Sequence, residues 1–334
     1  MDFENLIKTS FLTNKISQVT YNMLWELYRS YVTATKNTFT PLDEVEKIFR
    51  TYLKLVEQDY QTPFSFELFH KKVLSPFNHR TFGLDFLRPI VLSSTILHAE
   101  VVQDAVERLR QGENVIFLAN HQTEFDPHLI TLALSNASFP HFTDDMIFVA
   151  GDRVIKDPLA RPFSMGYDLL CIHSKRHIEH PPEEKEKRLR HNQKALQTFK
   201  SLLKKGSQCI YVAPSGGRDR RNEQEIIEIA PFDEGSIEVF RLLAKSSGKT
   251  MSFYPLALKT FDILPPPPVI KHSLGESRNI CRTDIFLAFG KNINIEDIPG
   301  IEKNHQRKIR RDLLFNSVLE LYQEILYFEQ SKST

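Results

Sequence analysis

The stretch that decides the fold is Val115-Ile116-Phe117-Leu118-Ala119-Asn120-His121-Gln122-Thr123-Glu124-Phe125-Asp126-Pro127, which a second apolar run follows at residues 129–134. This order is typical of a buried strand, a polar loop and a helix. Asp126 and Pro127 predict the N-cap and the first turn of that helix. His121 would then lie at the end of the strand, and its spacing from Asp126 suits a general base whose ring is oriented by a carboxylate. A structural histidine beside a strand end is the alternative interpretation.

Similar alternation continues from about residue 85 onward. Apolar runs predict strands at 115–119, 146–150, 168–173, 208–213, 252–258 and 284–289. Helical spacing predicts helices at 127–136, 182–205, 232–247 and 302–329. A further amphipathic helix is marked by Leu97, Val101, Ala105 and Leu109 and ends at Gly112. The pattern favours an α/β fold, a mixed sheet flanked by helices, with active groups at strand ends.

The first eighty residues show a helical pattern and no alternation of strands and helices. Apolar residues recur there at helical spacing, and Pro41-Leu42-Asp43-Glu44 reads as a helix start. We therefore expect a smaller N-terminal helical-bundle domain at residues 1–80 and an α/β domain at residues 81–334. The Pro265–Pro268 run predicts a stiff loop wall, because proline favours an extended backbone.

The composition narrows the class of protein. Hydrophobic residues make up 41% of the 334 residues and charged residues 25%, as in ordinary soluble globular proteins. The net charge of +1 gives no bias toward nucleic acid. No apolar run approaches the ~20 residues that cross a bilayer, and no secretory signal is visible. Cys171, Cys209 and Cys281 form neither a disulfide framework nor a zinc pattern, so we expect a reducing, cytosolic setting.

Two further loops carry cations, each after a predicted strand. They are Ser174-Lys175-Arg176-His177 and Pro214-Ser215-Gly216-Gly217-Arg218-Asp219-Arg220-Arg221. Guanidinium groups donate in a fork that matches phosphate oxygens. Residues 175–221 hold thirteen Lys and Arg against five Asp and Glu, which favours an anionic partner on this side.

The same cations can also be explained without a ligand. The arginine loop can be a solvated charged turn, and the lysines between 185 and 205 read as the solvated face of one helix. A docking patch for an acidic carrier protein is the weaker alternative for that helix. Ser215 resembles half of a nucleophile elbow, but Ala213 stands where that motif needs glycine, so a nucleophilic role is disfavoured.

The ordered set of motifs resembles the soluble, plastid-type glycerol-3-phosphate 1-acyltransferases of the His-x4-Asp glycerolipid acyltransferase superfamily. The likeness covers roughly residues 85–290, and the helical N-terminus fits that family's two-domain plan. Besides the three loops, it runs through Gly151-Asp152-Arg153-Val154, Ala230-Pro231-Phe232-Asp233, Tyr254-Pro255-Leu256-Ala257-Leu258 and Asp262-Ile263-Leu264 with the prolines.

The resemblance implies an acyltransferase domain that moves an acyl group from an acyl carrier protein or coenzyme A thioester to the 1-hydroxyl of glycerol 3-phosphate. It implies His121 as the base and Asp126 as its partner, with no metal and no organic cofactor. The substrate phosphate would be held by Lys175, Arg176, His177, Arg218 and Arg220. Arg176 stands where the family has lysine, which makes that contact geometrically different.

Two other functions remain open at this point. A lysophosphatidate acyltransferase shares His-x4-Asp, although such proteins usually carry membrane-embedding segments. A non-catalytic module that binds acyl carrier protein or phosphate is the other alternative, and the intact His121 and Asp126 argue against it. No nucleic-acid partner is expected, whereas peripheral membrane contact is left open. We expect a bacterial cytosolic protein, or a mature form in the plastid stroma.

Overall fold

The computed structural model describes residues 2–174, 178–179, 181–267, 276–298 and 302–332. Within these residues one mixed sheet of eight strands runs in the order β1-β5-β4-β6-β3-β9-β10-β2. The strands are β1 (Phe69–His70), β2 (Val91–Leu97), β3 (Asn114–Ala119), β4 (Ile147–Ala150), β5 (Asp168–Cys171), β6 (Cys209–Val212), β9 (Met251–Lys259) and β10 (Thr283–Phe289). A separate ribbon pairs β7 (Arg220–Arg221) with β8 (Ile227–Glu228).

The direction of the strands places the three predicted loops together. β3 is parallel to both β6 and β9, and β4 is parallel to both β5 and β6. The segments that follow β3, β5, β6 and β9 therefore leave the same edge of the sheet, where ligands bind in open α/β sheets. β1 and β10 are each antiparallel to their neighbours β5 and β9, which makes the sheet mixed, as predicted.

Helices cover both faces of the sheet. Their bounds are α4 (His79–Leu87), α5 (Glu100–Arg110), α6 (Asp126–Asn136), α7 (Arg153–Lys156), α8 (Arg161–Ser164), α10 (Lys185–Leu203), α11 (Glu234–Ser247) and α12 (Lys303–Lys332), with short 3-10 turns at Pro182–Glu184 and Phe261–Ile263. Alternate residues of β3 explain the two layers, because successive side chains of a strand point to opposite faces. Phe117 belongs to an apolar cluster that includes residues of α4, α5 and α6, whereas Ile116 and Leu118 belong to a second cluster that includes residues of α10, α11 and α12. All of β3 is buried, which accounts for its apolar run at residues 115–119.

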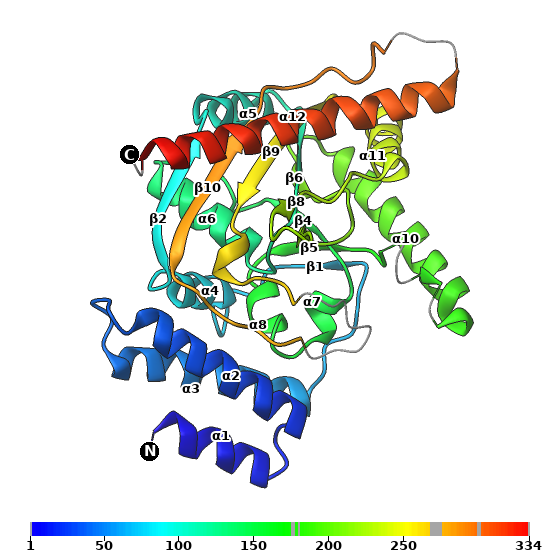
Figure 1. Cartoon of the computed structure of the whole chain (residues 1–334). Coiled ribbons are helices and arrows are strands. Elements are labelled where there is room, and N and C mark those ends of the chain that lie inside the picture. The colour runs from blue at the N-terminus through cyan, green and yellow to red at the C-terminus, as the bar shows by residue number, and fades with distance from the viewer. Residues whose placement is uncertain (1, 175–177, 180, 268–275, 299–301, 333–334) are drawn as a thin grey trace.

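The N-terminal helices α1 (Phe3–Leu12), α2 (Gln18–Thr35) and α3 (Leu42–Gln61) lie at the opposite end of the molecule from α12 (Figure 1). Aromatic rings join them, with Phe49 of α3 in contact with Phe3 and Tyr31. The same apolar cluster continues to Phe86 of α4 and on to the sheet. Strand β1 falls within the predicted helical range 1–80 but pairs with β5 of the large sheet. The division into two domains at residue 80 stays a prediction.

The six strands predicted from apolar runs are confirmed, and so are the four predicted helices. One expectation is wrong: Leu97 ends strand β2 and does not begin the amphipathic helix, which starts at Glu100. Residues 91–97 pair with β10 at the edge of the sheet and are only partly buried, so their sequence lacks the apolar run of a central strand. No helix in the described part of the chain is long and apolar enough to cross a membrane.

Candidate active site

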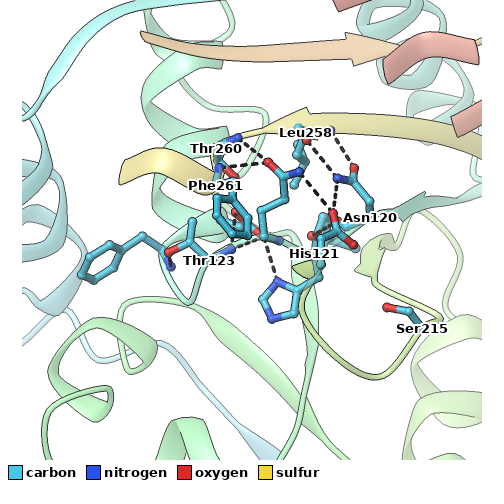
Figure 2. Close-up of polar contacts among 12 residues, drawn as sticks. Asn120, His121, Thr123, Ser215, Leu258, Thr260 and Phe261 are labelled. Carbon is cyan, nitrogen blue, oxygen red and sulfur yellow. Dashed lines mark hydrogen bonds and ion pairs between the residues drawn. The ribbon is translucent and has the colours of Figure 1, made fainter. Parts of the chain in front are cut away.

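His121 and Asp126 form a hydrogen-bonded pair between the end of β3 and the start of α6. The ring Nδ1 lies 2.8 Å from Asp126 Oδ2 (Figure 2). Asp126 is completely buried, whereas the His121 side chain is 30% exposed. Since an ionised carboxylate only accepts, Nδ1 carries the proton and donates it, which leaves the Nε2 lone pair available. The pair therefore has the geometry of a general base oriented by an aspartate.

Asp126 is held in place from several sides. Its carboxylate accepts the backbone N–H groups of Gln122 at 3.0 Å and Thr123 at 3.3 Å. It also accepts the Thr260 hydroxyl at 2.7 Å, from the segment that follows β9. The expected N-cap role is wrong: Asp126 is the first residue of α6, and Phe125, whose side chain makes no cap hydrogen bond, occupies the cap position. The carboxylate turns back toward His121 instead.

Asn120 and Gln122 flank the base and are fully buried. Asn120 accepts the Leu258 N–H at 2.7 Å and donates to the Leu258 carbonyl at 2.9 Å. Gln122 accepts the N–H groups of Thr260 at 2.7 Å and Phe261 at 2.9 Å (Figure 2). Residues 120–126, which we call the base loop, are thus fastened to the end of β9. The sequence pattern did not single out these two amides, although they stand directly before and after His121 at the end of a buried strand.

Residues 213–221, which we call the arginine loop, follow β6 at the same edge. Gly216 has φ +64°, a left-handed conformation that favours glycine. The backbone N–H of Asp219 donates to the His121 carbonyl at 2.6 Å, so the loop lies directly against the base. Arg218 and Arg220 flank that contact in sequence. The structure therefore brings the predicted cations of this loop next to the predicted base.

Each arginine of the loop has a different partner. Arg218 donates to the buried carboxylate of Glu276. Burial alone would raise the pKa of Glu276, but Arg218 and the nearby Arg153 and Arg278 hold that pKa below its usual range. Arg220 Nη1 donates to the Pro267 carbonyl at 2.5 Å, within the predicted proline wall.

The remaining predicted residues of the two cationic loops have different outcomes. Lys175, Arg176 and His177 lie outside the described residues, so their roles stay predictions. The Ser215 hydroxyl donates to the Gly217 carbonyl at 2.8 Å, within its own loop. Figure 2 shows Ser215 on the same side of the site as His121. No hydrogen bond joins Ser215 to His121 among the residues that the structure covers, which agrees with the disfavoured nucleophile.

A buried arginine, Arg278, also holds the base loop through its ion pairs. Arg278 is 3% exposed and donates to both carboxylate oxygens of Glu124, at 2.6 and 3.0 Å. It also reaches Asp157 at 2.9 Å. Glu124 lies in the same loop as His121, but its partner Arg278 is 154 residues away, so sequence spacing could not reveal the pair.

His128, two residues after Asp126 in α6, is a structural histidine. It is 1% exposed, and neither ring nitrogen has a hydrogen-bond partner in the described part of the chain. Gly83 of α4 leaves the space for the ring, because a Cβ built there would lie 2.1 Å from Nε2. Burial lowers the pKa of His128 from its ordinary value of 6.5 to about 3. The ring therefore stays neutral in the folded protein.

The difference between the pKa of His128 in the folded chain and in the unfolded chain predicts a loss of stability in mild acid. As the pH falls below 6.5, the unfolded chain binds a proton at His128 that the folded chain does not bind until about pH 3. We expect the unfolding free energy to fall by about 1 kcal/mol more in the parent protein than in His128→Leu between pH 6 and pH 5. Urea unfolding at both pH values measures it. His141→Leu, which changes an exposed ring, is the control. An equal fall in unfolding free energy from pH 6 to pH 5 in His128→Leu and in the parent would contradict the prediction.

Comparison with known proteins now adds to this geometry. The family model described as Acyltransferase matches residues 100–259, which include both the base loop and the arginine loop. A chloroplastic glycerol-3-phosphate acyltransferase of Cucurbita moschata is 38% identical over 304 residues, covering 89% of this chain and 68% of that protein. The chain belongs to the glycerol-3-phosphate acyltransferase family. It is accordingly an acyltransferase, and the family expected from the sequence is confirmed.

Other members of the family match less of their own length. The chloroplastic enzyme of Spinacia oleracea is 37% identical, with 81% of this chain and 58% of that protein covered. The chain spans about two thirds of the length of the first relatives that it matches. A solved structure, the 1-acyl-sn-glycerophosphate acyltransferase PlsC of Thermotoga maritima, aligns over 96% of this chain and 94% of its own at 14% identity. Its TM-score is 0.42, and nothing about this chain follows from a likeness at that level.

In the residues that the structure describes, no group of three or more His, Cys, Asp or Glu side chains is arranged to hold a metal ion. Cys171, Cys209 and Cys281 are free thiols, the first two buried in strands β5 and β6. The polar groups that the structure shows at the site are an imidazole, a buried carboxylate and nearby guanidinium groups.

Proposed function

We propose that this chain transfers a fatty acyl group from an acyl thioester to the 1-hydroxyl of glycerol 3-phosphate, giving 1-acyl-glycerol 3-phosphate. The observation that carries the proposal is the hydrogen bond from the Asp219 N–H to the His121 carbonyl at 2.6 Å. Because of it, an oriented base and two guanidinium groups lie on adjoining loops. A phosphorylated alcohol needs such a combination, one group to accept a proton and others to hold the phosphate.

The reaction divides between the two parts of the site. His121 Nε2 accepts the proton of the 1-hydroxyl as its oxygen attacks the thioester carbonyl carbon. Asp126, bonded to Nδ1, stabilises the imidazolium that forms. When the tetrahedral intermediate collapses, the carbon–sulfur bond breaks and the leaving thiolate takes the proton back from His121. The chain then returns to its starting state with no acyl-enzyme and no cofactor.

Phosphate recognition belongs to Arg218 and Arg220 in this proposal, with Lys175, Arg176 and His177 as further donors. Arg218 is neutralised by Glu276 in the free protein, so phosphate binding there exchanges one anion for another. Phosphate affinity then becomes effective concentration of the hydroxyl at His121. The acyl donor is an acyl carrier protein or coenzyme A thioester. We propose the plastid stroma as the location, which the names of the chloroplastic relatives support, with a bacterial cytosol as the alternative.

A thiol-release assay tests the proposal. The purified protein is incubated with palmitoyl-carrier protein or palmitoyl-coenzyme A, with and without glycerol 3-phosphate. We expect free thiol and 1-acyl-glycerol 3-phosphate in equal amounts, and only when the acceptor is present. Thiol release without acceptor would indicate a thioesterase. Acylation of lysophosphatidate in place of glycerol 3-phosphate would indicate the alternative acceptor, and no release with either donor would favour a binding module.

The phosphate contact predicts a defect in substrate binding. Arg220→Ala should raise the KM for glycerol 3-phosphate roughly 10- to 100-fold, the usual range for losing a hydrogen bond to a charged group, and should change kcat little. Arg221→Ala is the matched control, because the guanidinium of Arg221 pairs with Asp262 at 2.8 Å and is not assigned to the phosphate. Steady-state kinetics with varied acceptor measures both. An unchanged KM in Arg220→Ala would remove this residue from the phosphate site.

A further inference from the structure

Asp219 is a buried carboxylate that the reaction described above does not use. It lies between the two arginines and has no solvent exposure. One carboxylate oxygen accepts the side-chain N–H groups of Asn120 at 2.8 Å and Gln122 at 3.2 Å. The other oxygen accepts the Ala230 N–H at 2.9 Å. Together with its own N–H on the His121 carbonyl, Asp219 therefore joins the arginine loop to the base loop at several points.

The base loop has anchors of its own that do not involve Asp219. Each of three side chains in it bonds to the end of β9 or to the residues that follow that strand. These bonds run from Asn120 to the Leu258 backbone, from Gln122 to the N–H groups of Thr260 and Phe261, and from Asp126 to the Thr260 hydroxyl. None of these bonds involves the Asp219 carboxylate, so we expect them, and the orientation of His121, to survive its removal.

The arginine loop is affected differently. Without the Asp219 carboxylate it loses its bonds to Asn120 and Gln122, and it keeps the single N–H bond to the His121 carbonyl on that side. Arg218 and Arg220 flank Asp219 directly, so a movement of this residue moves the origin of both side chains. The carboxylate thus acts on the relative placement of arginines and base more than on the base itself.

The donors around Asp219 match an ionised carboxylate. The amide N–H groups of Asn120, Gln122 and Ala230 can only donate, so each needs an acceptor. Burial raises the pKa of Asp219 to about 6, and these hydrogen bonds and the nearby His121 oppose the rise. At pH 7.5 the group is therefore charged and satisfies all of them. An asparagine at this position would turn one N–H toward another donor.

We propose that Asp219 is a positioning residue that sets the distance between the His121 base and the phosphate-binding arginines. This inference rests on the proposed function, because it needs a phosphate on Arg218 and Arg220. It predicts that Asp219 matters for an acceptor whose hydroxyl is delivered through its phosphate. For an acceptor without phosphate, the arginines contribute nothing and their placement is irrelevant.

The test compares glycerol 3-phosphate with glycerol, supplied at molar concentration, in Asp219→Asn. We expect kcat/KM for glycerol 3-phosphate to fall roughly 100-fold, the cost of a misplacement of about 1 Å, and the value for glycerol to change less than about threefold. The ratio of the two values, measured on one preparation, does not depend on the fraction of folded enzyme. Asp262→Asn, a partly exposed carboxylate beside Arg221, is the control and should keep the parent ratio.

Other results would overturn the inference. Equal losses with both acceptors, or no loss with either, would show that Asp219 does not set this distance. If Asp219→Asn is not recovered in folded form, Asp219→Ser is measured in the same way, since its hydroxyl can still accept one amide. The proposed function fails separately: it fails if the parent protein acylates glycerol as well as it acylates glycerol 3-phosphate, whatever Asp219→Asn does.

Discussion

Replacing His121 by alanine is expected to lower kcat by about two to four orders of magnitude, the usual contribution of a positioned general base. The ring is held through Nδ1 by the buried Asp126 at 2.8 Å and the His121 side chain is 30% exposed, so Nε2 is the ring nitrogen left to act as the base. The measurement is thiol release from palmitoyl-carrier protein at saturating glycerol 3-phosphate.

The control for this variant is binding. The arginines proposed to bind the phosphate are on another loop. His121→Ala should therefore bind glycerol 3-phosphate within a few-fold of the parent affinity when titrated calorimetrically. Fold integrity is checked by the midpoint of urea unfolding. A turnover rate within tenfold of the parent would contradict the general-base role, and a parallel loss of binding would indicate a structural effect.

Asp126→Asn should produce a loss on the order of 10³- to 10⁴-fold in kcat, as expected when a base is left in the wrong tautomer. The carboxylate accepts from the His121 ring, from two backbone N–H groups and from Thr260, and an amide nitrogen cannot accept from any of them. Whichever way the amide turns, it either meets a donor or forces the proton of His121 onto Nε2. Steady-state kinetics at saturating substrates measures the loss.

Asp144→Asn is the matched control for this change. His141 and Asp144 form another histidine–carboxylate pair, at 2.9 Å, with both side chains more than a third exposed. Surface pairs of this kind contribute little, so the control should keep the parent kcat. If Asp126→Asn behaved like that control, Asp126 would have no part in orienting the base.

The sequence could predict the segment from β3 to α6 because an unbroken apolar run can only be a buried element. It could not predict β2, whose Ser93, Ser94 and Thr95 reflect a partly buried position at the edge of the sheet. The two-residue strand β1 carries no periodic signal at all. The helix boundary at Asp126 was misplaced by one residue, since the carboxylate serves the His121 ring and not the helix cap.

In the candidate site, the sequence predicted the residues whose chemistry is visible from their type. A histidine five positions before an aspartate, and arginines after glycines, suggest catalysis and phosphate binding by themselves. Asn120, Gln122 and Asp219 were not identified, because residues that they bond to are 97, 99 or 138 positions away in the sequence. The neutralisation of Arg218 by Glu276, 58 residues later, was hidden for the same reason.

The most direct test of the account is a crystal structure of the protein with glycerol 3-phosphate bound. The account predicts the phosphate on the guanidinium groups of Arg218 and Arg220, and the 1-hydroxyl oxygen within hydrogen-bonding distance of His121 Nε2. A phosphate bound elsewhere, or a 1-hydroxyl directed away from His121, would contradict it.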